Sequence, residues 1–372
     1  MTRPGTGAVR RVTAVVCAYT ERRFDDLAAS LASLEDQTRP PDDVVLVIDH
    51  APALARRARA AFASSVAVVE STHRRGLSGA RNTALDLLAD APGDRADHVV
   101  VFLDDDATAR PDVVARLLTP YRDRRVAAVG GAAAPRWPGL GAGAPALLPA
   151  ELWWVVGCSY PGQVQGPGPS EVRNLMGCVM SFRLAALDAA GAFTEDMGRV
   201  GTVPLGCEET ELCIRLRRAL PTTRIVLDPG AVVDHRVSTD RTRWSYLVRR
   251  SRAEGLSKAV LARRWGSADG LAAERTYTRR TLPAAVRRDL LAAARAVGRG
   301  EVSAARDGLA AAVAVPLALV LAVVGYVSGQ VADRVRRVGR PRGAPSREAA
   351  TSGAATSGAA TSEAATSEAA GA

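Results

Sequence analysis

Lysine and aromatic residues are scarce in this chain of 372 residues. Lys258 is the single lysine, so arginine supplies nearly all of the positive charge behind the formal net charge of +10. Aromatic residues make up only 4% of the chain, although 47% of it is hydrophobic, enough to bury a sizeable core. This composition excludes a collagen, a fully disordered chain and a polytopic membrane protein. A basic chain is typical of nucleic-acid-binding proteins. Here, however, the excess of arginine over lysine in an alanine-rich sequence indicates a bias in codon usage rather than selection for phosphate contacts.

Cysteine is also sparse, and its spacing carries no motif. The five cysteines are odd in number and include no CxxC pair, so they indicate neither a disulfide framework nor a zinc site. Scattered thiols suit the cytosol. The apolar run of residues 12–18 is too short for the core of a signal peptide. We therefore expect a cytoplasmic body.

The longest stretch without a formal charge covers residues 308–332. It is long enough to cross a bilayer as a helix, although Pro316 and Gly325 interrupt it. Six arginines follow between Arg334 and Arg347, and a single crossing would export them against the positive-inside tendency. We therefore expect residues 308–332 to lie in or dip into the cytoplasmic face of the cell membrane. The Ala-Thr-Ser repeats within 333–372 predict a disordered tail.

Short valine-rich runs alternate with helical patterns over the first 130 residues. Continuous apolar runs are typical of buried parallel strands, and the alternation with helices predicts an α/β, doubly wound sheet of Rossmann-like character. The predicted strands are 12–17, 44–48, 66–69, 99–103 and 126–129, and the predicted helices are 25–35, 53–63, 78–89 and 111–121. We expect a catalytic domain over 1–235 and a basic helical extension over 236–307.

Charged side chains follow these strands, at the sheet edge where ligands of such folds bind. Asp49 follows the second strand, the segment 76–82 with Arg81 follows the third, and Asp104-Asp105-Asp106 follows the fourth. Three adjacent carboxylates repel one another, and Mg²⁺ or Mn²⁺ would relieve that repulsion. An acidic turn that caps the next helix needs only one aspartate, so the triplet favours a metal site.

Two later features allow both a structural and a functional interpretation. Glu208 and Glu209 stand where a helix begins, so they are either simple partners of the helix dipole or a general base held at the edge of a site. His235 follows an apolar run. A histidine by itself is more often structural than a ligand, but an acidic triplet elsewhere makes the two readings nearly even.

In this order the motifs resemble the family 2 glycosyltransferases, which are inverting, metal-dependent enzymes of GT-A fold with nucleotide-sugar donors. The resemblance extends from about Val12 to Lys258. It rests on the segments 15–21, 33–37, 47–49, 76–82, 102–106 and 206–211. It implies a GT-A-type mixed sheet with a C-terminal helical and hydrophobic extension, and a donor that we take to be a UDP-sugar.

The resemblance also implies roles for individual residues. Glu209 stands where the family more often has the aspartate base, with Glu208 as the alternative. The implied Mg²⁺ or Mn²⁺ ligands are Asp104, Asp106 and His235. The implied donor-binding residues are Ala18, Tyr19, Glu21, Asp49, Gly76, Arg81, Asp104 and Asp105.

Aromatic residues gather between Trp137 and Tyr160. Trp153, Trp154 and Tyr160 either bind the acceptor, by stacking on a sugar or touching a lipid headgroup, or cover the sheet edge. The basic, amphipathic stretch 241–258 favours an anionic lipid surface or a lipid-linked phosphate. The expected acceptor is therefore a glycan or a polyprenyl-phosphate-linked sugar at the membrane surface.

Two other functions fit part of the sequence. Asp104 to Thr108 matches the DxDxT motif of haloacid-dehalogenase-like phosphatases, in which Asp104 would be the nucleophile. That motif usually opens its domain, whereas strand–helix units precede it here. A basic nucleic-acid-binding protein would leave the acidic triplet unexplained, because carboxylates repel phosphates, and we expect no nucleic-acid partner.

Overall fold

The computed structural model describes residues 9–338 apart from 138, 140–142, 164–165, 199–204 and 267–276. The chain divides into a large unit, Met1–Gly329, and a C-terminal unit, Gln330–Ala372. Most of the predicted disordered tail, from residue 339 onward, lies outside the described residues.

Four parallel strands form one half of a nine-stranded mixed sheet, in which eight strands have the order β3-β2-β1-β4-β8-β6-β9-β5 and the ninth, β7, pairs with β9 off this path. They are β1 (Arg11–Ala18), β2 (Asp43–Ile48), β3 (Ala67–Glu70) and β4 (His98–Asp104). All four were predicted. The expectation that each is buried is wrong for β3, whose residues are exposed or half-buried because it is an edge strand with a neighbour on one side only.

The other half of the sheet is mixed. β8 (Val179–Arg183) runs antiparallel to both β4 and β6 (Val126–Arg136). β9 (Arg224–Arg236) runs parallel to β6 and antiparallel to β5 (Ala107–Ala109) and β7 (Ser170–Glu171). The predicted strand at 126–129 therefore exists as part of β6, but its neighbour on one side is antiparallel.

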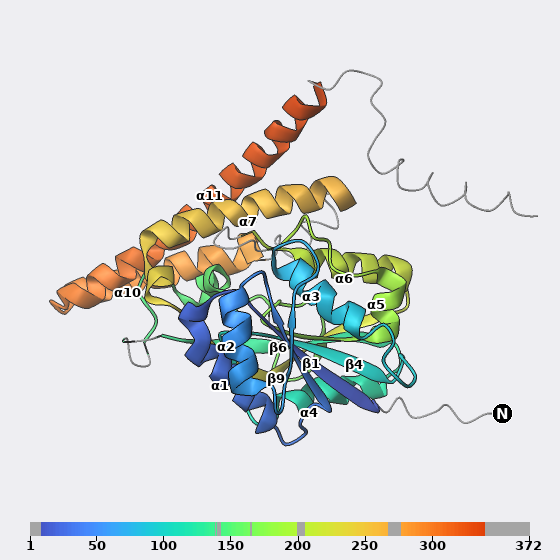
Figure 1. Cartoon of the computed structure of the whole chain (residues 1–372). Coiled ribbons are helices and arrows are strands. Elements are labelled where there is room, and N and C mark those ends of the chain that lie inside the picture. The colour runs from blue at the N-terminus through green and yellow to red at the C-terminus, as the bar shows by residue number, and fades with distance from the viewer. Residues whose placement is uncertain are drawn as a thin grey trace, which may run out of the picture. The chain divides into compact units, whose positions relative to one another are not determined.

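Helices cover both faces of the sheet (Figure 1). The first face packs α1 (Phe24–Glu35), α2 (Pro52–Phe62) and α4 (Val113–Leu118). The second face packs α3 (Leu77–Leu87), α5 (Leu184–Ala190) and α6 (Glu208–Ala219). The short helical turns are η1 (Glu21–Arg23), η2 (Thr119–Arg122), η3 (Ala150–Val156), η4 (Thr239–Thr242) and the π-turn η5 (Tyr277–Thr281).

Two glycines fix how α3 begins. Gly76 precedes the helix with φ at 136°, a conformation that side-chain-bearing residues avoid. A Cβ on Gly79 would lie 2.0 Å from the Arg74 carbonyl oxygen, so the chain can fold back there only without a side chain. These glycines of the segment 76–82 therefore set the start of the helix that carries Arg81.

Three long helices, α7 (Trp244–Trp265), α10 (Leu282–Gly298) and α11 (Val302–Val338), follow the sheet. Tyr246 of α7, Leu282 of α10 and Val315 of α11 share an apolar cluster with Leu152 of η3. The backbones of α7 and α11 approach closely, because a Cβ on Gly255 would lie 1.9 Å from the Ala322 carbonyl oxygen.

The charge-free segment predicted at 308–332 is the middle of α11, which continues through Pro316 and runs past the predicted end of the segment. Among the described residues, its portion Val302–Ala332 is the one helix long and apolar enough to cross a membrane by length and composition, and a third of its most apolar window is buried inside the protein. Its position relative to a membrane stays a prediction.

Candidate functional site

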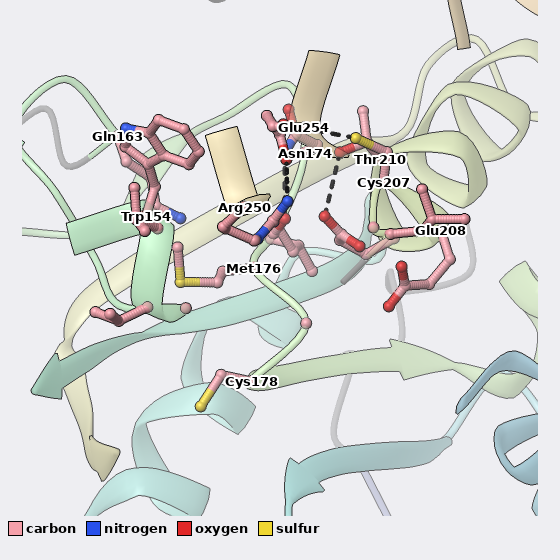
Figure 2. Close-up of a pocket in the computed structure, with 18 of the residues that line it drawn as sticks. Trp154, Gln163, Asn174, Met176, Cys178, Cys207, Glu208, Thr210, Arg250 and Glu254 are labelled. Carbon is pink, nitrogen blue, oxygen red and sulfur yellow. Dashed lines mark hydrogen bonds and ion pairs between the residues drawn. The ribbon is translucent and has the colours of Figure 1, made fainter. Parts of the chain in front are cut away.

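A cavity of about 1080 Å³ opens at the carboxyl ends of β1, β2 and β4. Figure 2 shows Trp154 and Glu208 on opposite sides of it, with Arg250 and Glu254 between them. The predicted site residues that line this cavity are Ala18, Tyr19, Asp49, Arg81, Asp104, Asp105, Asp106, Trp154, Tyr160, Glu208, Glu209 and His235. One cavity thus brings together residues that are far apart in the sequence.

Three predicted site residues do not line the cavity. Glu21 is exposed in η1. Gly76 donates its backbone N–H to Asp49 Oδ2 over 3.0 Å and so supports the cavity wall from behind. Trp153 donates its indole N–H to the Leu148 carbonyl oxygen, which directs its ring into the apolar cluster.

Cationic side chains surround the aspartate triplet. Arg23 reaches Asp106 Oδ2 over 2.5 Å and Asp105 Oδ2 over 3.0 Å. Arg241 Nη2 lies 3.5 Å from Asp106 Oδ2. Arg23 is not among the predicted site residues, and Arg241 begins the stretch 241–258 that was expected at a lipid surface or a lipid-linked phosphate. Arg23 lies two residues after the segment 15–21, and this closeness to the first strand end is the signal that would have pointed to it.

Burial and neighbouring charges separate the pKa values of the three aspartates. Burial, together with the Asp106 charge, raises the pKa of Asp104. Burial raises the pKa of Asp105 to about 8, although the positive charge of Arg23 acts to lower it. Burial also opposes ionisation of Asp106, but the nearby His235 and arginines outweigh it and hold that pKa well below its usual value.

His235, near the end of β9, completes the acidic end of the cavity. Its Nε2 lies 3.3 Å from Asp106 Oδ1, and its Nδ1 lies 3.7 Å from Cys158 Sγ. Burial lowers the pKa of His235, but the Asp106 carboxylate reverses this effect and raises it to about 10. Asp104, Cys178 and His235 each offer a ligand atom, and these atoms all lie within 4.8 Å of one another. This donor set fits a divalent cation.

Arg81 connects the acidic end of the cavity to helix α6. It is only 2% exposed. Its guanidinium lies 3.1 Å from Glu208 Oε1 and 3.7 Å from Asp104 Oδ1, and it donates to the Gly177 carbonyl oxygen over 3.0 Å. Glu208 is therefore engaged in a buried ion pair, which is unsuitable for a group that must take up a proton.

Glu209 has different surroundings from Glu208. It is half-buried and accepts a hydrogen bond from Thr210 Oγ1 over 3.3 Å. Burial, followed by repulsion from Glu208, raises the pKa of Glu209 to about 8. Cys207, directly before α6, has φ at 73°, a left-handed backbone that costs a residue with a side chain about 1–3 kcal/mol. The helix start is thus held in a strained geometry beside these glutamates.

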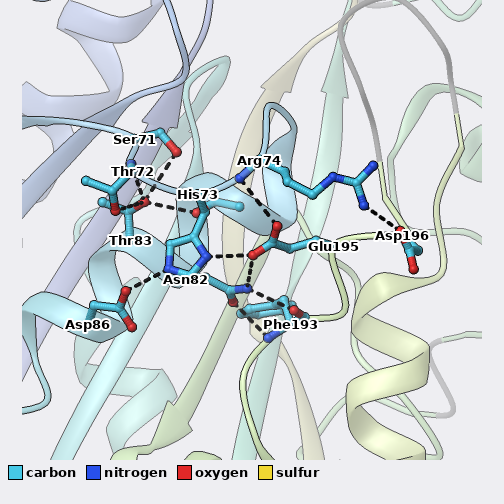
Figure 3. A network of polar contacts seen from close by, with 11 residues as sticks. Ser71, Thr72, His73, Arg74, Asn82, Thr83, Asp86, Phe193, Glu195 and Asp196 are labelled. Atoms are coloured by element: carbon cyan, nitrogen blue, oxygen red, sulfur yellow. Dashed lines mark hydrogen bonds and ion pairs between the residues drawn. The ribbon is translucent and has the colours of Figure 1, made fainter. Parts of the chain in front are cut away.

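A polar network anchors the chain that leads toward α6 (Figure 3). His73 lies between two carboxylates, 2.6 Å from Glu195 Oε1 and 2.6 Å from Asp86 Oδ2. Asn82 donates to the Phe193 carbonyl oxygen over 2.9 Å and accepts from the Phe193 N–H over 2.8 Å. Residues 193–195 are therefore held against α3 from both directions.

The opposite wall of the cavity is apolar. Trp154 and Tyr160 line it, and the Tyr160 ring lies 5.3 Å from the ring of Tyr277. The wall continues onto α11 through Val315, Ala318, Leu319, Ala322, Val323 and Tyr326. A second, apolar groove of about 700 Å³ between α10 and α11 shares four lining residues with the cavity. They are Thr278, Leu282, Val315 and Leu319.

Residues 13–152 match the family model described as glycosyl transferase family 2. A relative, the glucosyl-dolichyl phosphate glucuronosyltransferase of Haloferax volcanii, is 32% identical over 254 residues, which are 68% of this chain and 77% of that protein. Among solved structures, the mannosyltransferase PcManGT from Pyrobaculum calidifontis, in complex with GDP-Man and Mn²⁺, has a TM-score of 0.54 at 20% identity. The match covers 85% of this chain and 87% of that chain.

These comparisons confirm the resemblance seen in the sequence, and the likeness to a solved glycosyltransferase confirms the GT-A-type fold. The phosphatase and nucleic-acid-binding alternatives are set aside, because the family match over residues 13–152 includes the aspartate triplet and the relative is itself a glycosyltransferase. The chain is a glycosyltransferase, and it belongs to glycosyltransferase family 2.

Proposed function

We propose that this protein transfers a sugar from a nucleotide-sugar donor, a UDP-sugar, to a sugar carried by a polyprenyl-phosphate lipid. The observation that carries the proposal is one cavity with an acidic end, a glutamate at its side and an apolar wall. The name of the Haloferax volcanii relative, a transferase for a glucosyl-dolichyl phosphate, supports an acceptor of this class.

Asp104, Asp106 and His235 would hold Mg²⁺ or Mn²⁺. When bound there, the cation supplies positive charge that offsets the charge developing on the leaving diphosphate. Asp49, which lines the cavity beside Ala18 and is fixed by the Gly76 N–H, would bind the nucleoside.

Glu209 is the proposed general base. It takes the proton of the acceptor hydroxyl, and the hydroxyl oxygen then forms a bond to the sugar C1 from the face opposite the nucleotide. The C1–O bond to the diphosphate breaks with its electron pair on the nucleotide, and the configuration at C1 is inverted. Arg81 keeps Glu208 occupied, which supports Glu209 as the residue that receives the proton.

The acceptor phosphate would lie near α7. Arg250 and Lys258 line the cavity and both contact Glu254, which leaves their cationic groups inside the site. The lipid chain would then leave along the groove between α10 and α11. Large apolar side chains are exposed on both helices, among them Leu290, Leu291, Leu309 and Val320. We propose that they contact the cytoplasmic face of the cell membrane.

A transfer assay tests the proposal. Full-length protein in detergent is given a panel of UDP- and GDP-sugars, Mn²⁺ and, in separate reactions, a polyprenyl-phosphate-linked monosaccharide or a water-soluble glycan. We expect the lipid product to form with one UDP-sugar and to disappear when EDTA is added. A panel that yields product only with water-soluble glycans would overturn the lipid acceptor, and unchanged activity in EDTA would overturn the cation.

A further inference from the structure

Cys178 is the one member of the three-residue donor cluster to which the proposed function gives no role. Its thiol is only 3% exposed. The sulfur, a carboxylate oxygen of Asp104 and a ring nitrogen of His235 all lie within 4.8 Å of one another. A thiol, a carboxylate and an imidazole that converge in this way form a set of metal ligands in which the sulfur is a soft ligand and the carboxylate oxygen a hard one.

The sheet fixes this arrangement. Cys178 directly precedes β8, and its carbonyl oxygen accepts a hydrogen bond from the Asp104 N–H over 3.1 Å. The next pair along is Leu103 opposite Val179, in antiparallel register. His235 pairs with Ala107 on β5, just after the aspartate triplet. Backbone pairing therefore brings Cys178 to Asp104, independently of any one side-chain rotamer.

The chemistry of the set differs from that of carboxylates alone. Mg²⁺ and Mn²⁺ prefer oxygen ligands, whereas Zn²⁺ and Cd²⁺ bind thiolate and imidazole strongly. Around a tetrahedral Zn²⁺, ligand atoms at the usual bond lengths lie about 3.5 Å apart. The separations here are close enough for small side-chain rotations to meet that requirement.

We propose that Cys178, with Asp104 and His235, makes this site a second kind of metal site that captures thiophilic cations and thereby stops transfer. The inference rests on the proposed function for the role of the cation. Binding replaces the thiol proton, which passes to solvent, by a metal–sulfur bond. A tetrahedral cation with three protein ligands keeps a single open position, whereas an octahedral Mg²⁺ or Mn²⁺ with three protein ligands keeps several for the donor diphosphate.

Cd²⁺ alone is the probe, added to reduced full-length protein without donor. The readout is the ultraviolet charge-transfer absorption of a cadmium–thiolate bond. We expect the wild type to show this band at one equivalent of Cd²⁺. Cys178→Ser should lose the band. Cys213→Ser, which removes a buried thiol on α6, should keep it.

Zn²⁺ inhibition gives the second readout, with each variant compared with its own rate in Mn²⁺. Cys178→Ser should be at least tenfold less sensitive to Zn²⁺ than the wild type and than Cys213→Ser. A band or a Zn²⁺ sensitivity that persists in Cys178→Ser would overturn the proposal. If Cys178→Ser does not fold, Cys178→Ala is used in its place in both measurements. A protein that shows the band but no transfer with any donor would instead contradict the proposed function.

Discussion

Two adjacent glutamates at the start of α6 have different electrostatic surroundings. Glu208 is paired with the buried Arg81, whereas Glu209 is half-buried beside that pair, with a pKa raised to about 8 by burial and by Glu208. A base with a pKa near the working pH combines a large ionised fraction with a strong tendency to accept a proton. The arrangement therefore suits Glu209 to proton transfer and Glu208 to holding the site together.

Replacing Glu209 tests this division of roles. Glu209→Gln keeps the size of the side chain but removes the proton acceptor, so kcat should fall by about 100- to 10,000-fold. Donor binding, followed by isothermal titration calorimetry with Mn²⁺, should persist. Glu301→Gln, at the exposed turn before α11, is the matched control and should leave both values unchanged. Normal turnover in Glu209→Gln would refute the assignment.

The pH dependence of kcat/KM provides a second test of Glu209 as the base. The base is active only when it is ionised, so kcat/KM should rise as the pH increases through about 8. Repulsion from Glu208 is part of what raises this pKa. In Glu208→Gln the midpoint of the profile should therefore move to lower pH. A midpoint that stays in place or moves upward would show that another group controls the rate.

At the scale of elements, a polar network around His73 joins α3 to residues 193–195, and Thr194 in turn donates to Glu211 of α6 over 3.0 Å. Asp86 first, and Glu195 with it, raise the pKa of His73 by hydrogen bonding. A pKa that is higher in the folded state stabilises the protein fully below the unfolded pKa, and the contribution is lost as the pH rises through the folded pKa. The network therefore stabilises this region most under mildly acidic conditions.

His73→Gln tests the network through thermal unfolding. The variant should have a lower Tm than the wild type at pH 6, and the difference should be smaller at pH 9, because the protonated fraction of His73 falls as the pH rises. Arg74→Gln is the control, because its ion pair with Asp196 is exposed on both sides and contributes little. Equal differences at both pH values would exclude charge as the cause.

The helices α7 and α11 cross closely at Gly255, and this crossing can be tested by substitution. Gly255→Leu would drive a side chain into the Ala322 carbonyl oxygen, which is backbone and cannot turn away. We expect the Tm to fall by several degrees and transfer to lipid acceptors to fall with it. Gly298→Ala, near the end of α10 with open space around it, is the control and should be neutral or slightly stabilising. A fully stable Gly255→Leu protein would contradict the crossing.

The sequence predicts elements best where apolar runs are long. The valine-rich strands β1, β2 and β4 and the helices between them are visible in the sequence. β5 and β7 have only three and two residues, too few for a periodic pattern. The placement of β8 between β4 and β6 depends on long-range pairing, so nothing local places Cys178 beside Asp104. Arg241 likewise reaches Asp106 across 135 residues of chain, which motif spacing does not encode.

At the scale of the whole molecule, the cavity with its acidic end and the apolar groove between α10 and α11 share four lining residues. Leu290 and Leu291 line the groove and are 47% and 46% exposed, so changing them should hardly affect folding. We expect Leu290→Glu combined with Leu291→Glu to raise the KM for a long-chain polyprenyl-linked acceptor about tenfold, because charges would enter the lipid path. A short-chain acceptor should be used as before.

Leu87→Glu provides the matched control. Leu87 is 51% exposed at the end of α3 and lines neither the cavity nor the groove. Its KM for the long-chain acceptor should equal that of the wild type. Equal use of both acceptors by the double variant would place the lipid elsewhere.

Arg81 limits how this fold can be recombined. Its guanidinium contacts Asp104 and Gly177 near the sheet and Glu208 on α6, so the partners of one side chain come from the sheet edge and from a later helix. Without α6, Arg81 would lose the carboxylate nearest to it, and without Arg81 the buried Glu208 would lose its cationic partner. A chimaera that takes α3 from one relative and α6 from another must therefore inherit this arginine and its glutamate together. Segments exchanged between relatives to change the acceptor preference must therefore leave the contact between Arg81 and Glu208 intact.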